Sequence, residues 1–121
     1  AAGVVDEDNF SPLIKDSIDM ILRIHKKTKN IVFVSGSDKK SIAMETEQVM
    51  KNLAAVLEAA GMGFEQVVKS SIFLDDMAHF AVVNEVYGRY FDEDQAPARE
   101  TVAVQTLPKN VRVEISMIAI L

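Results

Sequence analysis

Two charged side chains near the C-terminal end of this 121-residue chain have the chemistry expected of a functional site. Pro97 fixes its own φ and favours an extended Ala96, so no helix can continue through this point. We therefore expect Arg99 at the mouth of a strand that runs from Thr101, where its planar guanidinium could bind a carboxylate or a phosphate. Glu114 stands in an otherwise apolar run. It could serve as a general base, or it could simply form a structural ion pair with Arg99.

The composition narrows the classes of function. The chain has no cysteine and two histidines, which excludes disulfides and thiolate nucleophiles and disfavours a metal site. A formal net charge of −5 and a pI of about 5.0 disfavour binding to nucleic acid. No apolar run is long enough to span a membrane, and the first ten residues carry acids where a signal peptide needs positive charge. We expect a cytoplasmic protein with no cofactor.

The spacing of apolar residues predicts elements in the order ββαβαββ. The predicted strands are 18–25, 31–35, 66–74, 101–106 and 111–121, and the predicted helices are 41–60 and one that Asp76 caps. Gly61 is suited to end the first helix in the left-handed conformation. In the second helix one apolar stripe is expected to face the core, made by Met77, Phe80, Val83, Tyr87 and Tyr90.

This order is typical of one α+β domain, residues 17–121, preceded by an N-terminal arm, residues 1–16. Both helices should pack on one face of a mixed sheet and leave the other face bare. Several strands are apolar on both faces, among them 31–34 and 117–121. An apolar face must be buried against something, and a second copy of the chain is the simplest partner. The pattern therefore predicts homo-oligomerisation.

The C-terminal motifs resemble the signature of the Rid (YjgF-type) family. They are Pro97-Ala98-Arg99, Leu107-Pro108-Lys109 and Val113-Glu114-Ile115, and further matching segments lie within 52–61, 68–77 and 80–91. The resemblance covers roughly the last two-thirds of the chain. It implies a chorismate-mutase-like fold assembled as a homotrimer, with clefts between the subunits.

The resemblance also implies a reaction, the hydrolytic deamination of reactive 2-imino or 2-enamino acids to 2-oxo acids and ammonia. Arg99 would bind the substrate carboxylate, and Glu114 would position or activate the attacking water. The substrate-binding positions that it implies are Ser35, Gly36, Asn84, Tyr87 and Thr101. Helix packing explains Asn84 and Tyr87 equally well, and Thr101 could be an ordinary strand residue.

Three departures from the family pattern keep alternatives open. Leu13 stands where a cleft tyrosine is typical, and residues 37–40 lead almost directly into the helix in place of a longer loop. Glu100 replaces a small residue and is expected to add a negative charge beside Arg99. One alternative is a non-catalytic member of the family that binds or responds to small carboxylates. Another is RNA cleavage or inhibition of translation, against which the acidic composition counts.

Overall fold

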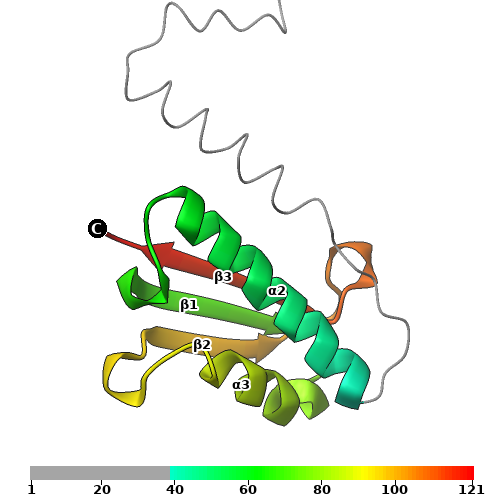
Figure 1. Ribbon diagram of the computed structural model, residues 1–121. Coiled ribbons are helices and arrows are strands. Elements are labelled where there is room, and N and C mark those ends of the chain that lie inside the picture. The colour runs from blue at the N-terminus through cyan, green and yellow to red at the C-terminus, as the bar shows by residue number, and fades with distance from the viewer. Residues whose placement is uncertain (1–38) are drawn as a thin grey trace, which may run out of the picture.

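The computed structural model describes residues 39–121, which form two helices on one face of a three-stranded mixed sheet (Figure 1). This arrangement confirms the predicted α+β class and the predicted placement of both helices on one face. The arm 1–16 and the predicted strands 18–25 and 31–35 lie outside the described residues.

The long helix α2 spans Lys39–Ala59, close to the predicted 41–60. Its buried side is marked by fully enclosed Ile42, Met50 and Thr46, and the Thr46 hydroxyl donates to the backbone carbonyl of Ile42 at 2.8 Å. The helix ends as expected at Gly61, whose φ is +72°. Met62 N–H donates to Leu57 O at 2.8 Å and Gly61 N–H to Glu58 O at 3.0 Å, which satisfies the last carbonyls in a Schellman motif.

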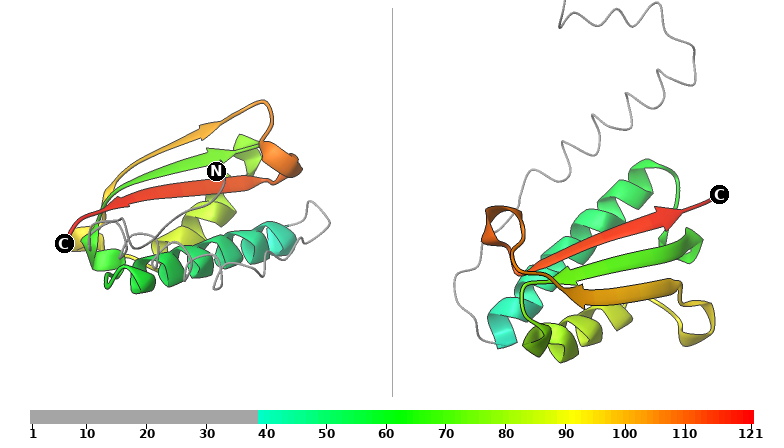
Figure 2. Two further views of the ribbon diagram at one scale, coloured as in Figure 1. Left: turned by 90° about the horizontal axis from the view of Figure 1, so that it is seen from above. Right: turned by 180° about the vertical axis from the view of Figure 1, so that it is seen from behind.

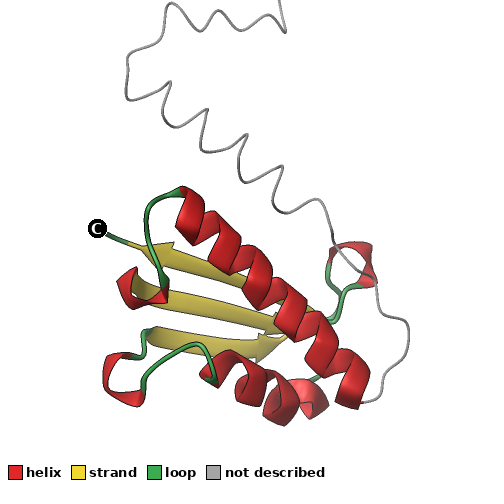
Figure 3. Ribbon diagram, viewed as in Figure 1, coloured by secondary structure: helices red, strands yellow, loops and turns green. Residues whose placement is uncertain are grey.

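Strand β1, Val67–Leu74, is central among the described strands. It pairs in parallel with β2, Ala98–Ala103, and antiparallel with β3, Val113–Ala119 (Figures 2 and 3). The prediction that β2 begins at Thr101 was wrong by three residues. Arg99 is therefore paired within the sheet, which fixes the face on which its side chain lies.

A bulge between Val67 and Lys69 changes the alternation of β1. The sequence pattern places Val67 with Phe73 on the face away from the helices, but Val67 is buried with Ser70, Ile72 and Leu74. The uncovered face, meaning the sheet face that no helix of residues 39–121 covers, thereby loses Val67 and also carries polar residues, so it is mixed in character and not apolar throughout as expected. Residues on it alternate along each strand with those that face the helices, and they are Lys69, Ser71, Phe73, Glu100, Val102, Glu114, Ser116 and Ile118.

The second helical segment begins as predicted at Asp76, whose carboxylate accepts from Ala78 N–H at 2.9 Å. A 3₁₀ turn, Met77–His79, precedes helix α3, Phe80–Gly88. The predicted stripe is right for buried Val83 and Tyr87. It is wrong at its N-terminal end, because Met77 is 44% and Phe80 37% exposed.

The core lies between the sheet and the two helices (Figure 2). Its buried members are Ile42, Met50, Ile72, Leu74, Val83, Tyr87, Val113 and Ile115. Neither helix of residues 39–121 is long and apolar enough to cross a membrane.

Candidate functional site

Arg99 lies on the helix side of the sheet, beside Ser70 of β1 in the parallel register. Its Nη1 donates to Oδ1 of Asn84, on α3, at 2.5 Å. The guanidinium carbon lies 5.2 Å from the ring centroid of Tyr87 and 5.9 Å from that of Phe80. An arginine is attracted to aromatic faces at such distances. The structure thus brings Arg99 together with two of the predicted binding residues, Asn84 and Tyr87.

A cavity of 420 Å³ opens at this cluster. It is lined by Asn84, Tyr87, Gly88, Phe91, Glu93, Ala96, Pro97 and Arg99. Arg99 is the one positively charged side chain among these lining residues. Its remaining N–H donors make the cavity suited to a small organic anion with an apolar substituent.

Tyr87 contributes its ring to this site and keeps its hydroxyl inside the protein. The phenol donates to the hydroxyl oxygen of Ser70, which is fully buried, at 3.0 Å. Burial raises the pKa of Tyr87, while the bond to Ser70 and the charge of Arg99 lower it. The ring also packs against Phe91, with 4.8 Å between centroids. Tyr87 is therefore both a core residue and a wall of the cavity.

Thr101 lies on the same strand face as Arg99 and pairs with Ile72 of β1. Its hydroxyl oxygen is enclosed and has no hydrogen-bond partner among the described residues. Thr101 is not among the residues that line the Arg99 cavity. The structure therefore does not bring this predicted binding residue to the cavity.

Glu114 lies on the other face of the sheet. On β3 it is paired with Phe73 of β1, whereas Arg99 on β2 is paired with Ser70 along the other edge of β1. The neighbours Val113 and Ile115 point into the core, so the exposed Glu114 points away from the helices. Within one chain the two residues do not form the structural ion pair that the sequence allowed. Ser35 and Gly36, and with them Leu13, lie outside the described residues.

The structure corrects the expected effect of Glu100. Its side chain lies on the uncovered face, where it accepts from the Ser71 hydroxyl at 2.5 Å and pairs with Lys69 Nζ at 2.5 Å. Hydrogen bonds from Lys69 and Ser71 lower the pKa of the Glu100 carboxyl. The negative charge is thus matched locally and separated from Arg99 by the sheet, because successive strand residues point to opposite faces.

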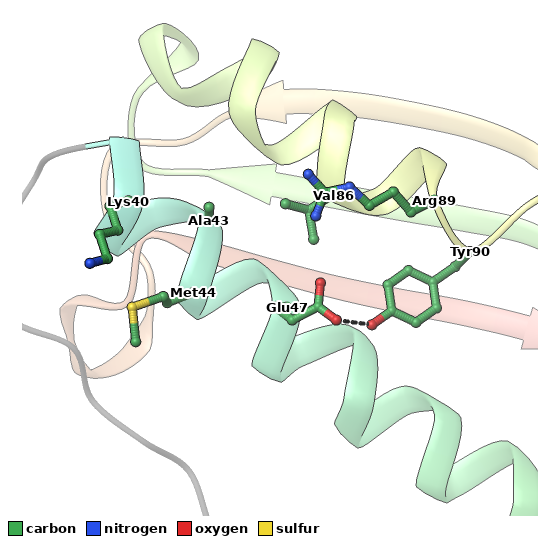
Figure 4. Close-up of a pocket in the computed structure, with 7 residues that line it drawn as sticks. All are labelled: Lys40, Ala43, Met44, Glu47, Val86, Arg89 and Tyr90. Atoms are coloured by element: carbon green, nitrogen blue, oxygen red, sulfur yellow. Dashed lines mark hydrogen bonds between the residues drawn. The ribbon is translucent and has the colours of Figure 1, made fainter.

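A second cavity, of 390 Å³, lies between α2 and α3 (Figure 4). Its lining residues are Lys40, Ala43, Met44, Glu47, Val86, Arg89 and Tyr90. The Tyr90 hydroxyl donates to the Glu47 carboxylate across it, and burial together with Glu47 raises the pKa of Tyr90 to about 12. None of the predicted site residues within 39–121 lines this cavity.

Sequence reasoning missed two residues beside Arg99, Phe80 and Ser70. Phe80 was assigned to the core stripe, and no local pattern shows that its ring lies near the guanidinium of Arg99 in the folded chain. Ser70 carried a weak signal as a small polar residue within the apolar strand 66–74. Among residues 39–121, no three His, Cys, Asp or Glu side chains are grouped so as to hold a metal ion.

Comparison with known proteins gives a consistent family. The model of the Endoribonuclease L-PSP family matches residues 23–121. The chain is 53% identical over 81 residues to a RutC family protein of Synechocystis, covering 67% of this chain and 62% of that protein. It is 41% identical over 105 residues to the chloroplastic Reactive Intermediate Deaminase A of Arabidopsis thaliana, covering 78% and 56%.

Solved structures agree with this result. The Escherichia coli protein TdcF, crystallised with bound serine, is 36% identical and superposes with a TM-score of 0.62, covering 72% of this chain and 68% of that one. The chain spans about three fifths of the length of the Synechocystis and Arabidopsis relatives. From the match over residues 23–121 and these identities, the chain belongs to the Endoribonuclease L-PSP family, whose members also carry the names YjgF, RutC and Rid.

Proposed function

We propose that this protein hydrolyses reactive 2-imino or 2-enamino acids to 2-oxo acids and ammonia, with Arg99 binding the substrate carboxylate. The observation that carries the proposal is the Arg99 cavity. A guanidinium supported by Asn84 and two aromatic rings opens into 420 Å³ of space, enough for a small carboxylic acid. A relative at 41% identity is named a reactive intermediate deaminase, and TdcF was crystallised with an amino acid.

The proposed chemistry requires little of the protein beyond orientation and one base. Water adds to the carbon of the C=N bond while a carboxylate accepts a proton from the water and passes it to the nitrogen. The resulting carbinolamine then loses ammonia to leave the C=O bond, and its hydroxyl proton goes to the departing nitrogen. Holding the acid in one orientation toward that water supplies much of the acceleration in such reactions. We assign the base or water-positioning role to Glu114. No cofactor takes part in this scheme.

Because Glu114 and Arg99 of one chain lie on opposite faces of the sheet, we propose that a site combines Arg99 of one subunit with Glu114 of a neighbour. A homotrimer with clefts between subunits provides such an arrangement in cyclic order. The uncovered face supports an interface because it carries Phe73 together with Val102 and Ile118, which are 41% and 60% exposed. The same face carries Glu114.

A second candidate function is binding of small carboxylates without turnover. It is favoured by the fact that the described part of one chain forms the Arg99 cavity without Glu114. Such a protein would retain the anion site and report the level of 2-oxo or 2-imino acids to a partner.

A coupled assay with freshly generated 2-iminobutanoate separates the two candidates. Under the deaminase proposal the wild-type protein accelerates release of 2-oxobutanoate. Glu114→Gln should bind 2-oxobutanoate normally and lose turnover, since an amide cannot accept the proton. If the wild-type protein binds the acid through Arg99 but never accelerates hydrolysis, the binding function is correct and the deaminase proposal is wrong.

The family description also names an endoribonuclease. An RNA function predicts affinity that falls steeply as salt is raised, because released counterions dominate such binding. Titration of single-stranded RNA at two salt concentrations tests this reading. We expect no binding at physiological salt, given the net charge of −5.

A further inference from the structure

Ser70 is a buried residue of the sheet that lies next to Arg99 and can influence the orientation of its guanidinium. Ser70 is on the central strand β1, is 0% exposed and lies directly beside Arg99 in the parallel register. It nevertheless makes no contact with the cavity and is not among the residues that line it. Its polar partner is the hydroxyl of Tyr87, which donates to it at 3.0 Å.

The Tyr87 ring transmits this constraint. A buried phenol must keep a hydrogen-bond partner, and Ser70 therefore selects one position of the ring. The face of that ring lies 5.2 Å from the guanidinium carbon of Arg99. Asn84, one turn of α3 before Tyr87, accepts from the guanidinium at 2.5 Å. A shift of the ring would therefore change the orientation of the N–H donors that face the cavity.

We propose that Ser70 is a positioning residue for the anion site, acting through Tyr87 to hold the guanidinium of Arg99 in its ligand-binding orientation. This inference rests on the proposed carboxylate-binding function of Arg99. It predicts that the Ser70–Tyr87 bond contributes to ligand affinity although neither hydroxyl touches the ligand.

A merely structural role for the bond predicts a different set of results. Loss of a buried hydrogen bond lowers the free energy of unfolding in either case. Only a positioning role also weakens binding, and it should do so equally whichever partner is removed. Tyr87→Phe is the milder change because it keeps the ring and its packing against Phe91.

The test compares Ser70→Ala, Tyr87→Phe and the double variant, with calorimetry of 2-oxobutanoate binding and steady-state deaminase kinetics. Ser71→Ala is the matched control, because Ser71 is adjacent on β1 and its hydroxyl bonds to Glu100 on the other face. We expect each single variant to lose about threefold to tenfold in affinity, the worth of a hydrogen bond. KM should rise by that factor with kcat nearly unchanged, and the double variant should be no weaker than the singles. Ser71→Ala should bind as wild type.

Two results would overturn the inference. One is wild-type affinity in Tyr87→Phe, and the other is a double variant whose losses add. If Ser70→Ala does not fold, the ligand affinity of Tyr87→Phe alone tests the inference. Arg99→Lys distinguishes this inference from the function on which it rests. If Arg99→Lys binds normally, the carboxylate proposal fails. If Arg99→Lys loses binding while Tyr87→Phe does not, only the role of Ser70 fails.

Discussion

Three side chains hold the guanidinium of Arg99, and only one of them competes with an anionic ligand for its N–H donors. Tyr87 and Phe80 approach the guanidinium carbon within 5.2 and 5.9 Å, and neither ring competes with an anion for N–H donors. Asn84 does compete, because its Oδ1 accepts from Nη1. The free protein therefore keeps the guanidinium oriented at the cost of one donor, and a carboxylate can use the others or displace the amide.

Arg99→Lys tests the clamp itself. A lysine supplies a point charge where the arginine supplies a planar fork, so affinity for 2-oxo acids should fall by about 1.5–3 kcal/mol, the worth of a hydrogen bond to a charged group. The chain has two tyrosines and no tryptophan, so in a Tyr90→Phe background the intrinsic fluorescence comes from Tyr87 beside the site. Titration with 2-oxobutanoate in that background measures the affinity. Unchanged affinity with a loss of folding stability would show that Arg99 is structural.

Asn84→Asp should weaken binding more than Asn84→Ala. The aspartate would pair with the guanidinium as a charge and act as an internal competitor for the ligand, whereas alanine only removes an acceptor. We expect a loss of about twofold to fivefold in affinity for the aspartate variant, in line with an exposed ion pair. Asn52→Asp is the control. It introduces the same negative charge on α2, where the Asn52 side chain accepts a hydrogen bond from Gln48 and does not contact Arg99. Equal losses in both aspartate variants would contradict the competition.

Glu100→Gln should leave 2-oxo acid affinity within about twofold of wild type, because alternate strand residues face opposite sides of the sheet. The substitution should instead change the free energy of unfolding. The folded pKa of Glu100 lies below its ordinary 4.5, so its contribution is present above pH 4.5 and is lost as the pH falls through the lower folded value. Urea unfolding should show wild type and Glu100→Gln converging in acid. Severalfold tighter anion binding by the variant would show that Glu100 does repel an anion bound at Arg99, as the sequence had suggested.

At the level of single residues, the sequence predicted more of the Arg99 cluster than of its surroundings. The family resemblance assigned Asn84 and Tyr87 to the same site as Arg99, although helix packing explained both equally well, and the three side chains do meet. Residue type and spacing could not place Glu100, since the strand starts at Ala98 and the face of each side chain follows from pairing. The role of Ser70 depends on a bond across 17 positions of the chain, which no local pattern contains.

Two sets of side-chain contacts join the strands that bear the proposed site residues to the helices. One is the cluster of Arg99 with α3. The other joins α2 to the start of β3, where Arg112 donates its backbone N–H and Nε to Glu45 at 2.8 and 2.7 Å. Its Nη2 donates to Ser41 at 2.7 Å. These bonds fix the end of β3 that carries Glu114 relative to the long helix.

Glu45→Ala should destabilise the fold by on the order of 3 kcal/mol, because it removes one partner of a largely buried ion pair. The Glu45 and Arg112 side chains are 15% and 12% exposed. Glu85→Ala is the control, since the Glu85–Arg89 pair is 71% and 60% exposed. That variant should change the free energy of unfolding by less than about 1 kcal/mol. Urea unfolding of both variants measures the difference, and equal effects would contradict the structural role assigned to Glu45.

The sequence predicted the bounds of α2 and β1 nearly to the residue and the start of the second helical segment, because Gly61 and Asp76 give strong local signals. It failed where the sheet departs from regular alternation. The bulge at Val67–Lys69 moves Val67 into the core, and hydrophobic patterning alone cannot reveal a bulge. The three-residue error at the start of β2 has a similar cause, since pairing with β1 draws Ala98 and Arg99 into the sheet.

For the whole molecule, the mixed uncovered face changes the reason for expecting an oligomer. An unbroken apolar face would bind any partner, whereas Lys69, Glu100 and Glu114 among apolar residues demand a matching surface. We predict a trimer at micromolar concentration in sedimentation equilibrium. A monomer under these conditions would remove the cleft in which Glu114 of one subunit meets Arg99 of another.

Activity of mixed oligomers tests the central claim most directly. Arg99→Lys chains, which bind substrate weakly, and Glu114→Gln chains, which lack the base, are refolded together in equal amounts. They are assayed at a 2-iminobutanoate concentration at which neither variant alone shows appreciable activity. If each site takes Arg99 from one subunit and Glu114 from the next, random assembly should restore about a quarter of the wild-type activity per site. Wild-type chains mixed with the doubly substituted chain verify the mixing, and they should also retain about a quarter. The opposite result has two parts: the mixture of single variants stays inactive, and the control mixture keeps about half of the wild-type activity. That result would show that one chain supplies both residues of each site and would contradict the shared site proposed above.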